Sequence, residues 1–451
     1  MPEALLGGRL ADWASSLRYE DLPAPVVAQS KRLLLDTLGV AWGGSGADGI
    51  EPLRAMVVGQ GGAPESSVLA FGGRLPATQA AFLNGAMAAA LDFDSVHDQA
   101  GSHSDIVVIP AVLALAERER LSGREFLAAY AAGSEILVRL SLAVQAKPGW
   151  FYSSVLGVFG AAAGAARALR LDATRTRHAM GTALSRAAGT QLTLVERSLT
   201  KRLQSAFAAR DGVEAAQLAA CGVTSPARMF EGPGGFSELY GAVDAHKALD
   251  GLGREFLFPA LTLKRHASCY CNHAAIEATL DLVRRHGLRA AEAGEITVRL
   301  TPFMARLVGA PYAPGDNPQV SAQFSVRYSV ASILQRGRFT LDDILPAAAT
   351  DQVVCALAGR VQVEIDESKA GRFLPAAVRV RTTSGKDLEA TIATLAGTPA
   401  DPFTDAEVRA KALACFGAGA RPMAPDAATR IAERIAGLES VGDMREFLAS
   451  T

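Results

Sequence analysis

The sequence is poor in cysteine and aromatic residues, and it has almost no net charge. Five cysteines occur in 451 residues, aromatic residues make up 6% of the chain, and the formal net charge at pH 7 is −1. The cysteines form no even-numbered, regularly spaced framework, which favours a reducing cytosol over secretion. Because no basic block stands out, we expect no binding to nucleic acid through a charged surface.

The sequence also lacks segments that would direct it into a membrane or out of the cell. The N-terminal stretch, MPEALLGGRLADW, contains acidic residues and no long apolar core, unlike a signal peptide. No apolar run reaches membrane-spanning length without charges or glycines. We therefore expect a soluble, cytoplasmic protein without a membrane partner.

Helical spacing of apolar residues dominates the chain up to about residue 250. A capping-box pattern, Ser122 followed by Glu125, marks one helix start, and the small-residue run 153–168 predicts a tightly packed central helix. The predicted helices of this half are 4–17, 24–42, 77–91, 106–120, 124–145, 153–168, 172–188 and 210–220, with a short β-like piece at 67–70.

The pattern changes after Phe256, where alternating segments predict strands at 295–300, 360–365 and 377–382. Helices are expected beside them at 273–286, 320–335 and 341–346, and at the C-terminal end at 405–415, 425–435 and 441–448. The predicted fold is mainly α with an α+β second domain. An all-helical domain is formed from both chain ends (1–255 and 401–451), and the α+β domain comprises 256–400.

One polar cluster, Leu91–Asp105, lies between two apolar helical runs. Its acidic and imidazole groups are Asp92, Asp94, His97, Asp98, His103 and Asp105. Such groups are costly to bury unless they are paired, so proton transfer or metal binding are the functional interpretations. A solvated loop between helices is the alternative, and its turn residues suit that role.

Two later stretches concentrate cations. Lys201, Arg202 and Arg210 surround small residues at a helix start, where they form either an anion site or an exposed helix end. In 263–273, Lys264, Arg265, His266, Cys269, Cys271 and His273 occur together. The cysteine and histidine spacing fits no standard structural zinc pattern, so we expect no metal.

Other motifs are absent or structural. No GxGxxG follows a strand, and neither a Walker loop nor GxSxG is present. The glycine-rich 230–236 segment is interpreted as a rigid turn. Tyr328 lies beside Arg327 on an otherwise apolar helix, where a buried core tyrosine is the default.

Taken together, the chain resembles the MmgE/PrpD family. The motifs that carry the resemblance are LLLDTLGVAWGG (33–44), FLNGAMAAALDFD (82–94), SSVLGVFGAAAGAAR (153–167), LTKRL (199–203), FEGPGGF (230–236), SCYCNHAAIEA (268–278), QFSVRYSVA (323–331) and ADPFTDAEVRAK (400–411). The resemblance implies a helical domain from both termini, an α+β domain, a homodimer and a site between the domains. It implies no iron–sulfur cluster or organic cofactor.

The resemblance also assigns site residues. The matched catalytic positions are Asp92, His103, Lys201, Lys264, Cys269, His273 and Tyr328. This chain departs from the family pattern where Phe151, followed by Tyr152, and Gln204 replace the usual histidines, and where Ser95 replaces an aspartate. Loss of an active-site histidine puts dehydratase and decarboxylase activity in question but leaves the cations.

The family reactions place charge on a carbon next to a carboxylate, which fixed cations stabilise. We expect Lys201 and Lys264 to supply that charge, His103 to act as the base, and Tyr152, Tyr328 or Cys269 to act as the acid. We expect the substrate site to include Asp94, Phe151, Arg202, Gln204, Arg265 and His273.

The leading prediction is a cofactor-independent lyase of the dehydratase type acting on a di- or tricarboxylate such as a methylcitrate-like acid. The alternatives are an epimerase of a substituted succinate, a cis-aconitate-type decarboxylase and a catalytically silent carboxylate-binding dimer.

Overall fold

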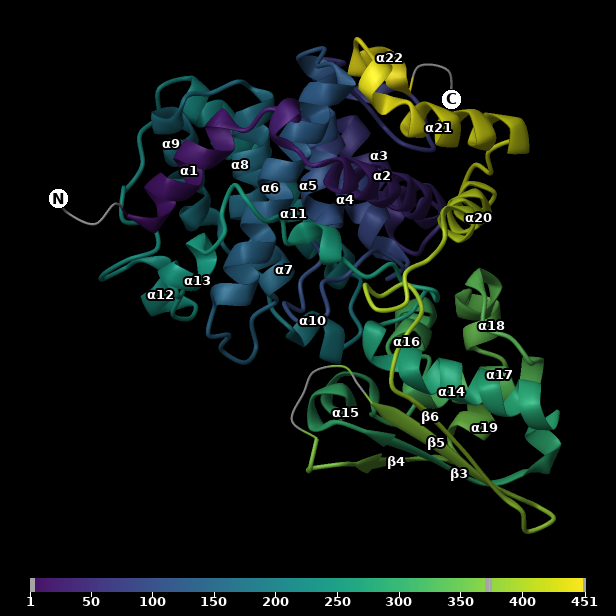
Figure 1. Ribbon diagram of the computed structural model, residues 1–451. Coiled ribbons are helices and arrows are strands. Elements are labelled where there is room, and N and C mark those ends of the chain that lie inside the picture. The colour runs from purple at the N-terminus through teal and green to yellow at the C-terminus, as the bar shows by residue number, and fades with distance from the viewer. Residues whose placement is uncertain (1–4, 370–372, 374, 449–451) are drawn as a thin grey trace.

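A helical body and a smaller body built on a β-sheet make up the computed structural model, which describes residues 5–369, 373 and 375–448 (Figure 1). Residues 1–4, 370–372, 374 and 449–451 of the expected domain ranges lie outside the described residues. The N-terminal helices are α1 (Leu6–Ser16), α2 (Ala24–Gly44), α3 (Ile50–Gly59), α4 (Ala77–Ala90), α5 (Asp105–Arg118), α6 (Gly123–Ala143), α7 (Tyr152–Val155), α8 (Gly157–Ala168), α9 (Ala173–Ala183), α10 (Leu192–Val195), α11 (Thr200–Ala220), α12 (Phe236–Leu239) and α13 (Ala245–Leu249).

The smaller body has a four-stranded mixed sheet in the order β4-β3-β5-β6. Val298 of β3 is paired with Val363 in the parallel strand β4 and with Val378 in the antiparallel strand β5. Its elements are α14 (Tyr270–His286), β3 (Ala293–Leu300), α15 (Pro302–Val308), α16 (Pro318–Gln323), α17 (Val326–Arg336), α18 (Pro346–Ala349), α19 (Gln352–Ala358), β4 (Val361–Ile365), β5 (Ala376–Thr382) and β6 (Asp387–Ile392). A two-stranded hairpin, β1 (Ser66–Ser67) and β2 (Arg74–Leu75), lies in the helical body.

The C-terminal segment returns to the helical body as α20 (Asp405–Phe416), α21 (Pro425–Ala436) and α22 (Met444–Phe447). In Figure 1 these yellow helices lie on the side of the body that holds α2. Helices α2 and α20 approach so closely that a Cβ on Gly39 would lie 3.0 Å from Ala412 Cα. The predicted fold class, a helical domain built from both chain ends plus an α+β domain, is confirmed.

The structure differs from the predicted elements in several places. Helices α3, α15 and α19 were not predicted, and the expected helix 341–346 is a 3-10 turn at Leu341–Ile344 followed by α18. The expected helix 153–168 breaks at Leu156 into α7 and α8. The expected helix 320–335 is interrupted because the Ser325 hydroxyl accepts a hydrogen bond from Tyr328 N and starts α17 anew. Strand β6 was not predicted, although Leu388, Ala390 and Ile392 alternate with polar residues along it.

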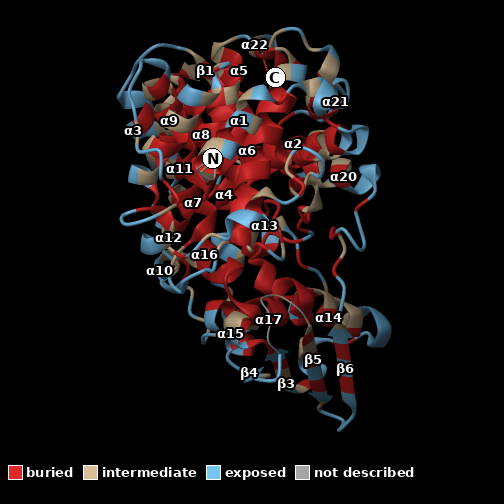
Figure 2. Ribbon diagram, turned by 60° about the vertical axis from the view of Figure 1, so that its left-hand side comes forward, coloured by how far each residue is buried: buried red, intermediate tan, exposed pale blue. Residues whose placement is uncertain are grey.

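Buried residues concentrate in the centre of the helical body (Figure 2). Among the described residues, α6 is the one helix long and apolar enough to cross a membrane, but 94% of its apolar window is buried inside the protein. Its two charged residues there are paired, with Arg139 Nε 2.6 Å from Glu135 Oε1. Burial of this kind is also found in core helices of globular proteins.

Close packing of α6 against α8 depends on glycines. A Cβ on Gly160 would lie 2.7 Å from Gly133 O and 2.8 Å from Leu137 Cβ, closer than real Cβ contacts. The tight packing that we predicted from the small residues of 153–168 is therefore confirmed for α8.

We predict that Gly160→Ala lowers the free energy of unfolding by about 1–3 kcal/mol, because a methyl group there must displace backbone of the facing helix. Gly8→Ala in α1 is the matched control, since nothing lies within 4 Å of a Cβ there. The control is expected to be neutral or to stabilise by up to about 1 kcal/mol. Urea unfolding of both variants checks this, and equal stabilities would contradict it.

Candidate active site

The turn after α4 carries the centre of the site. Asp92 is buried and has a left-handed backbone conformation, with φ 51°. Its carboxylate lies between two ammonium groups: Lys201 Nζ contacts Oδ1, and Lys264 Nζ is 3.3 Å from Oδ2. Lys264 Nζ also donates a hydrogen bond of 2.9 Å to the Asp92 carbonyl. Three distant parts of the sequence therefore meet at one carboxylate.

Different elements position the two lysines. Lys201 is in the first turn of α11. Lys264 is in the segment that leads from the helical body to α14, and that segment is fixed because Thr262 and Val96 exchange backbone hydrogen bonds of 2.8 and 3.0 Å. The site consequently lies where the chain crosses from one body to the other.

Asp94 and His103 form the second half of the network. His103 Nδ1 lies 2.7 Å from Asp94 Oδ2, and Asp94 Oδ1 is 3.7 Å from Lys264 Nζ. His103 Nδ1 also hydrogen-bonds to the Ser95 carbonyl at 2.9 Å. A carbonyl oxygen only accepts, so Nδ1 carries the proton and the neutral ring has its lone pair on Nε2.

The charges in the network stabilise one another. Burial would raise the pKa of Asp92, but Lys201 and Lys264 outweigh it and lower that pKa. Burial would likewise raise the pKa of Asp94, which Lys264 and His103 hold far below its usual value. Burial alone would lower the pKa of Lys264, but Asp92 and Asp94 raise it. The two carboxylates and the Lys264 ammonium group are therefore stabilised in their charged forms.

Access to the network is unequal. The His103 side chain is 17% exposed and that of Lys201 7%, whereas the Lys264 side chain has no exposed surface. A ligand that enters from solvent therefore meets His103 and Lys201 before Lys264.

Cys269 and His273 lie close by, at the start of α14. The hydrogen bond from Cys271 to Cys269, and to a smaller extent Lys264, lower the pKa of the buried Cys269 thiol. His273 Nε2 is 3.2 Å from the Ser268 carbonyl, and burial lowers its pKa well below the usual value. Over the described ranges, no group of three or more His, Cys, Asp and Glu side chains is placed to hold a metal ion.

The two tyrosines considered as acids have their hydroxyls engaged with backbone. Tyr152 Oη donates to the Tyr240 carbonyl and accepts from Lys147 N, both at 2.7 Å. Tyr328 Oη donates to the Asp343 carbonyl in the interior of the smaller body. The structure therefore does not bring Tyr328 to Asp92, and a role as acid stays a prediction for either tyrosine.

Three expected substrate-binding residues have structural contacts. Arg202 donates to the Asp48 carbonyl and, at 2.7 Å, to Gln319 Oε1, and its burial lowers its pKa to about 10. Gln204 Oε1 accepts from Thr190 N at 2.6 Å. Arg265 is exposed, 3.3 Å from Glu407.

Phe151 is buried, and its backbone N–H donates to the Gly189 carbonyl at 3.1 Å. Gly189 and Thr190 are adjacent, so Phe151 and Gln204 hold the same loop. The expectation that these residues bind substrate stays a prediction.

Asp105 was in the predicted polar cluster but received no role there. It is fully buried at the start of α5 and accepts hydrogen bonds from Ser95, Ser104 and Tyr130. The Ser95 hydroxyl donates to Asp105, and the Ser95 carbonyl accepts from His103 Nδ1. Asp105 therefore helps to position Ser95 and, through it, His103. The sequence feature that points to it is an aspartate at the head of a long apolar run.

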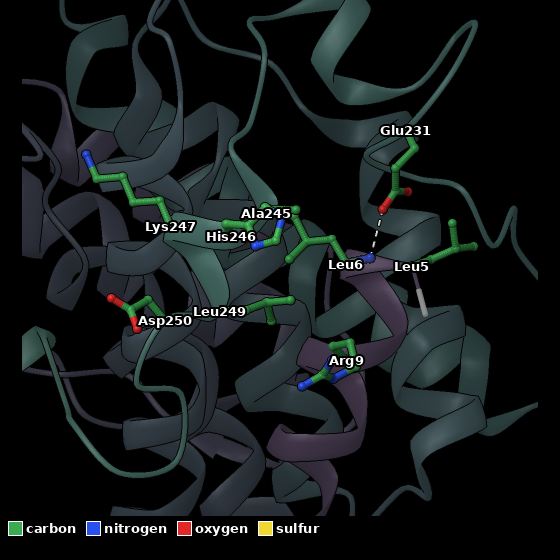
Figure 3. Close-up of a pocket in the computed structure, with 9 residues that line it drawn as sticks. All are labelled: Leu5, Leu6, Arg9, Glu231, Ala245, His246, Lys247, Leu249 and Asp250. Atoms are coloured by element: carbon green, nitrogen blue, oxygen red, sulfur yellow. Dashed lines mark hydrogen bonds between the residues drawn. The ribbon is translucent and has the colours of Figure 1, made fainter. Parts of the chain in front are cut away.

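A separate hollow lies at the N-terminal end of α1, beside α13 (Figure 3). It has a volume of about 920 Å³, and Glu231 at its edge accepts a hydrogen bond of 2.8 Å from Leu6 N. None of the predicted site residues lines it. The hollow is therefore separate from the candidate site at Asp92.

Comparison with known proteins agrees with the motifs. The model of the MmgE/PrpD N-terminal domain matches residues 8–247, and that of the MmgE/PrpD C-terminal domain matches residues 266–436. A cis-aconitate decarboxylase-like protein, oryM, of Aspergillus oryzae is 29% identical over 99% of this chain and 97% of its own length. Human cis-aconitate decarboxylase is 28% identical over 77% of this chain and 74% of its own.

The buried Asp105 gives a pH-dependent prediction. Burial raises its pKa to about 6, against hydrogen bonds that lower it. Between the unfolded value of about 3.9 and pH 6, the folded protein holds a proton that the unfolded chain releases, so this group's contribution to stability falls as pH rises, by about 1.4 kcal/mol per pH unit.

We therefore expect the free energy of unfolding of wild type, relative to Asp105→Asn, to increase as pH falls from 6.5 to 4.5. Chemical denaturation of both proteins across this range measures the difference. A difference that stays constant with pH contradicts the assignment.

Proposed function

The chain belongs to the MmgE/PrpD family, and from this membership we propose that it is a lyase acting on a di- or tricarboxylate. One observation carries the proposal: a buried carboxylate shared by two ammonium groups, next to a histidine held by a second carboxylate. This arrangement offers cations for an anionic substrate and an imidazole for proton transfer at the same place.

The reaction class follows from where charge develops. When a proton or CO₂ leaves a carbon next to a carboxylate, the electron pair delocalises into that carboxylate. Ammonium groups fixed in a site with little water stabilise the resulting charge by several kcal/mol. Lys201 and Lys264 are the groups placed to do this.

Substrate binding requires an exchange of partners, because both lysines already have the Asp92 carboxylate as a partner. We propose that a substrate carboxylate replaces Asp92 at Lys201, since Lys201 is the more accessible of the two lysines. Lys264 keeps its contacts with Asp92 and Asp94. Asp92 then balances the charge of Lys264 alone and no longer that of Lys201. The only carboxylate of a monocarboxylic acid would be used to bind Lys201. We therefore propose that the substrate has a second carboxylate, next to the reacting carbon, into which the electron pair delocalises.

His103 transfers the proton in this proposal. Nδ1 is committed to the Ser95 carbonyl and the Asp94 carboxylate, so Nε2 is the atom that accepts or delivers a proton. Asp94 stabilises the imidazolium form when the ring becomes charged. Cys269, whose thiol pKa is lowered, is the remaining candidate for a second acid.

Loss of CO₂ is the first reaction to test, because the curated relatives named above are a cis-aconitate decarboxylase and a decarboxylase-like protein. In that reaction a C–C bond breaks, CO₂ leaves, and the imidazolium form of His103, protonated at Nε2 from solvent, donates that proton to the electron pair left on carbon. The predicted dehydration is the second reaction: His103 removes the α-proton, and the C–O bond breaks with loss of hydroxide.

The test is to incubate the protein in D₂O with cis-aconitate, citrate, 2-methylcitrate and substituted succinates, and to follow each acid by NMR. Decarboxylation gives a shorter acid, dehydration gives an alkene, and epimerisation gives deuterium on an unchanged skeleton. We expect one of the first two products. Deuterium exchange without loss of CO₂ or water would favour the epimerase, and no change with any acid would contradict the proposal.

We further propose a homodimer without an organic cofactor, as the resemblance implies, and a cytoplasmic protein that needs no metal, as the cysteine content and the spacing of cysteine and histidine indicate. Activity that survives dialysis against a chelator, and a sedimentation mass near twice the 47.0 kDa chain, are the expected results. Loss of activity with the chelator, restored by a metal, would overturn the metal-independent reaction.

His103→Gln is expected to lower kcat by about two to four orders of magnitude, because glutamine cannot take up or release the proton. His246→Gln, at the exposed wall of the hollow in Figure 3, is the matched control and should leave kcat unchanged. Steady-state kinetics on the acid identified above make the comparison. A near-normal kcat for His103→Gln would remove His103 from the mechanism.

A further inference from the structure

A buried ion pair that the proposed mechanism does not use lies next to the Asp92–Asp94 turn. Lys411 Nζ of α20 is 2.7 Å from Asp36 Oδ1 of α2, and the two side chains are 7% and 1% exposed. Burial raises the pKa of Asp36, opposed by Lys411. The pair joins a helix from the start of the chain to a helix from its end.

Besides pairing with Asp36, Lys411 contacts Phe93, which lies in the turn that carries Asp92 and Asp94. Its Nζ donates a hydrogen bond of 2.8 Å to the Phe93 carbonyl and lies 4.0 Å from the centre of the Phe93 ring. Phe93 stands between Asp92 and Asp94, whose carboxylates bind the lysines and His103. The ammonium group of Lys411 therefore holds the backbone that connects the two acidic side chains.

The turn needs such support. Asp92 adopts a left-handed conformation, which is less favourable for an aspartate than the ordinary backbone regions. Two successive carbonyls of this turn are held by two different ammonium groups, that of Asp92 by Lys264 and that of Phe93 by Lys411. Lys264 belongs to the site itself, whereas Lys411 is paired with Asp36 outside it.

We infer that Lys411, neutralised by Asp36, is a positioning residue for the reaction: it fixes the Asp92–Asp94 turn and thereby the directions of both carboxylates. Through it, helix α20 sets the geometry of a site whose other residues lie at positions 92–103, 201 and 264. The inference rests on the proposed function, because it assigns Lys411 a role in that chemistry.

The test removes both charges together, because removing one partner would leave a buried charge unpaired. In Asp36→Val/Lys411→Met the apolar side chains fill the space, and the Phe93 carbonyl loses its donor. We expect kcat to fall about 10- to 100-fold with a smaller change in KM, as for displaced catalytic groups. The single variant Lys411→Arg, made in wild type, keeps both a cation and a donor at this position. Its kcat should stay within a few-fold of the wild-type value.

The matched control is Lys31→Met/Glu439→Gln. Lys31 also lies in α2, its Nζ is 2.8 Å from Glu439 Oε1, and it donates to the Ala436 carbonyl at 2.9 Å. This pair likewise ties α2 to the C-terminal region but does not touch the turn. We expect its kcat to equal that of wild type, whatever its effect on thermal stability.

A spectroscopic measurement separates this inference from the proposed function. In protein labelled with ¹⁵N-histidine, the His103 Nδ1–H signal, assigned with His103→Gln, reports the contacts to Ser95 and Asp94. We expect this signal to shift or disappear in Asp36→Val/Lys411→Met and to be unchanged in the control. If wild type is inactive on every acid, the proposed function fails, and this signal still decides the role of Lys411.

A double variant that is folded by circular dichroism, with wild-type kcat and an unchanged His103 signal, overturns the inference. If that variant does not fold, Asp36→Asn/Lys411→Leu, which keeps a polar side chain at position 36 but has no donor at position 411, is measured in the same way. Its wild-type kcat and unchanged signal would overturn the inference equally.

Discussion

The site depends on one interaction, the sharing of the Asp92 carboxylate between Lys201 and Lys264. All three groups are buried, and an unpaired charge in their place would cost several kcal/mol. Each comes from a different part of the chain, so the interaction forms only when α4, α11 and the segment before α14 are assembled. Three features lie around this interaction and hold its backbone: the left-handed turn at Asp92, the Thr262–Val96 bridge and the contact of Lys411 with the Phe93 carbonyl.

Balance of charge in the network has a functional consequence. A site with two unpaired ammonium groups would bind any anion, but here each lysine already has a carboxylate partner. A substrate must therefore offer a carboxylate that competes with Asp92 while its reacting carbon lies near His103. Selectivity then comes from geometry and desolvation, because net attraction to anions is small.

Sequence reasoning identified the network but not everything around it. The resemblance predicted Asp92, His103, Lys201 and Lys264, because its motifs are specific in their order and spacing although each is weak alone. The structure brings these four residues together. Arg265 shows why the rest is harder: it follows Lys264 directly, yet Lys264 is buried and Arg265 faces solvent towards Glu407. Residue type and position do not fix the side to which a loop residue points.

The fold class was predictable because apolar spacing and the strand alternation of β3, β4 and β5 are strong. The Asp36–Lys411 pair was not, since each member is one charged residue in a helix and only tertiary packing joins them. The aspartate within the apolar run LLLDTLGV is a sequence feature that indicates a buried, paired charge. Its partner, Lys411, lies 375 positions later in the chain and cannot be identified from spacing.

The most direct test of the exchange at Lys201 is calorimetric titration with propane-1,2,3-tricarboxylate, an unreactive acid without a hydroxyl or a double bond. We predict that Lys201→Met binds it at least tenfold more weakly than wild type, a loss of about 1.4 kcal/mol or more. Lys247→Met, at the exposed hollow beside α13, should bind it as wild type does. Equal affinities for Lys201→Met and wild type would contradict the central claim that Lys201 is the group on which the substrate carboxylate binds.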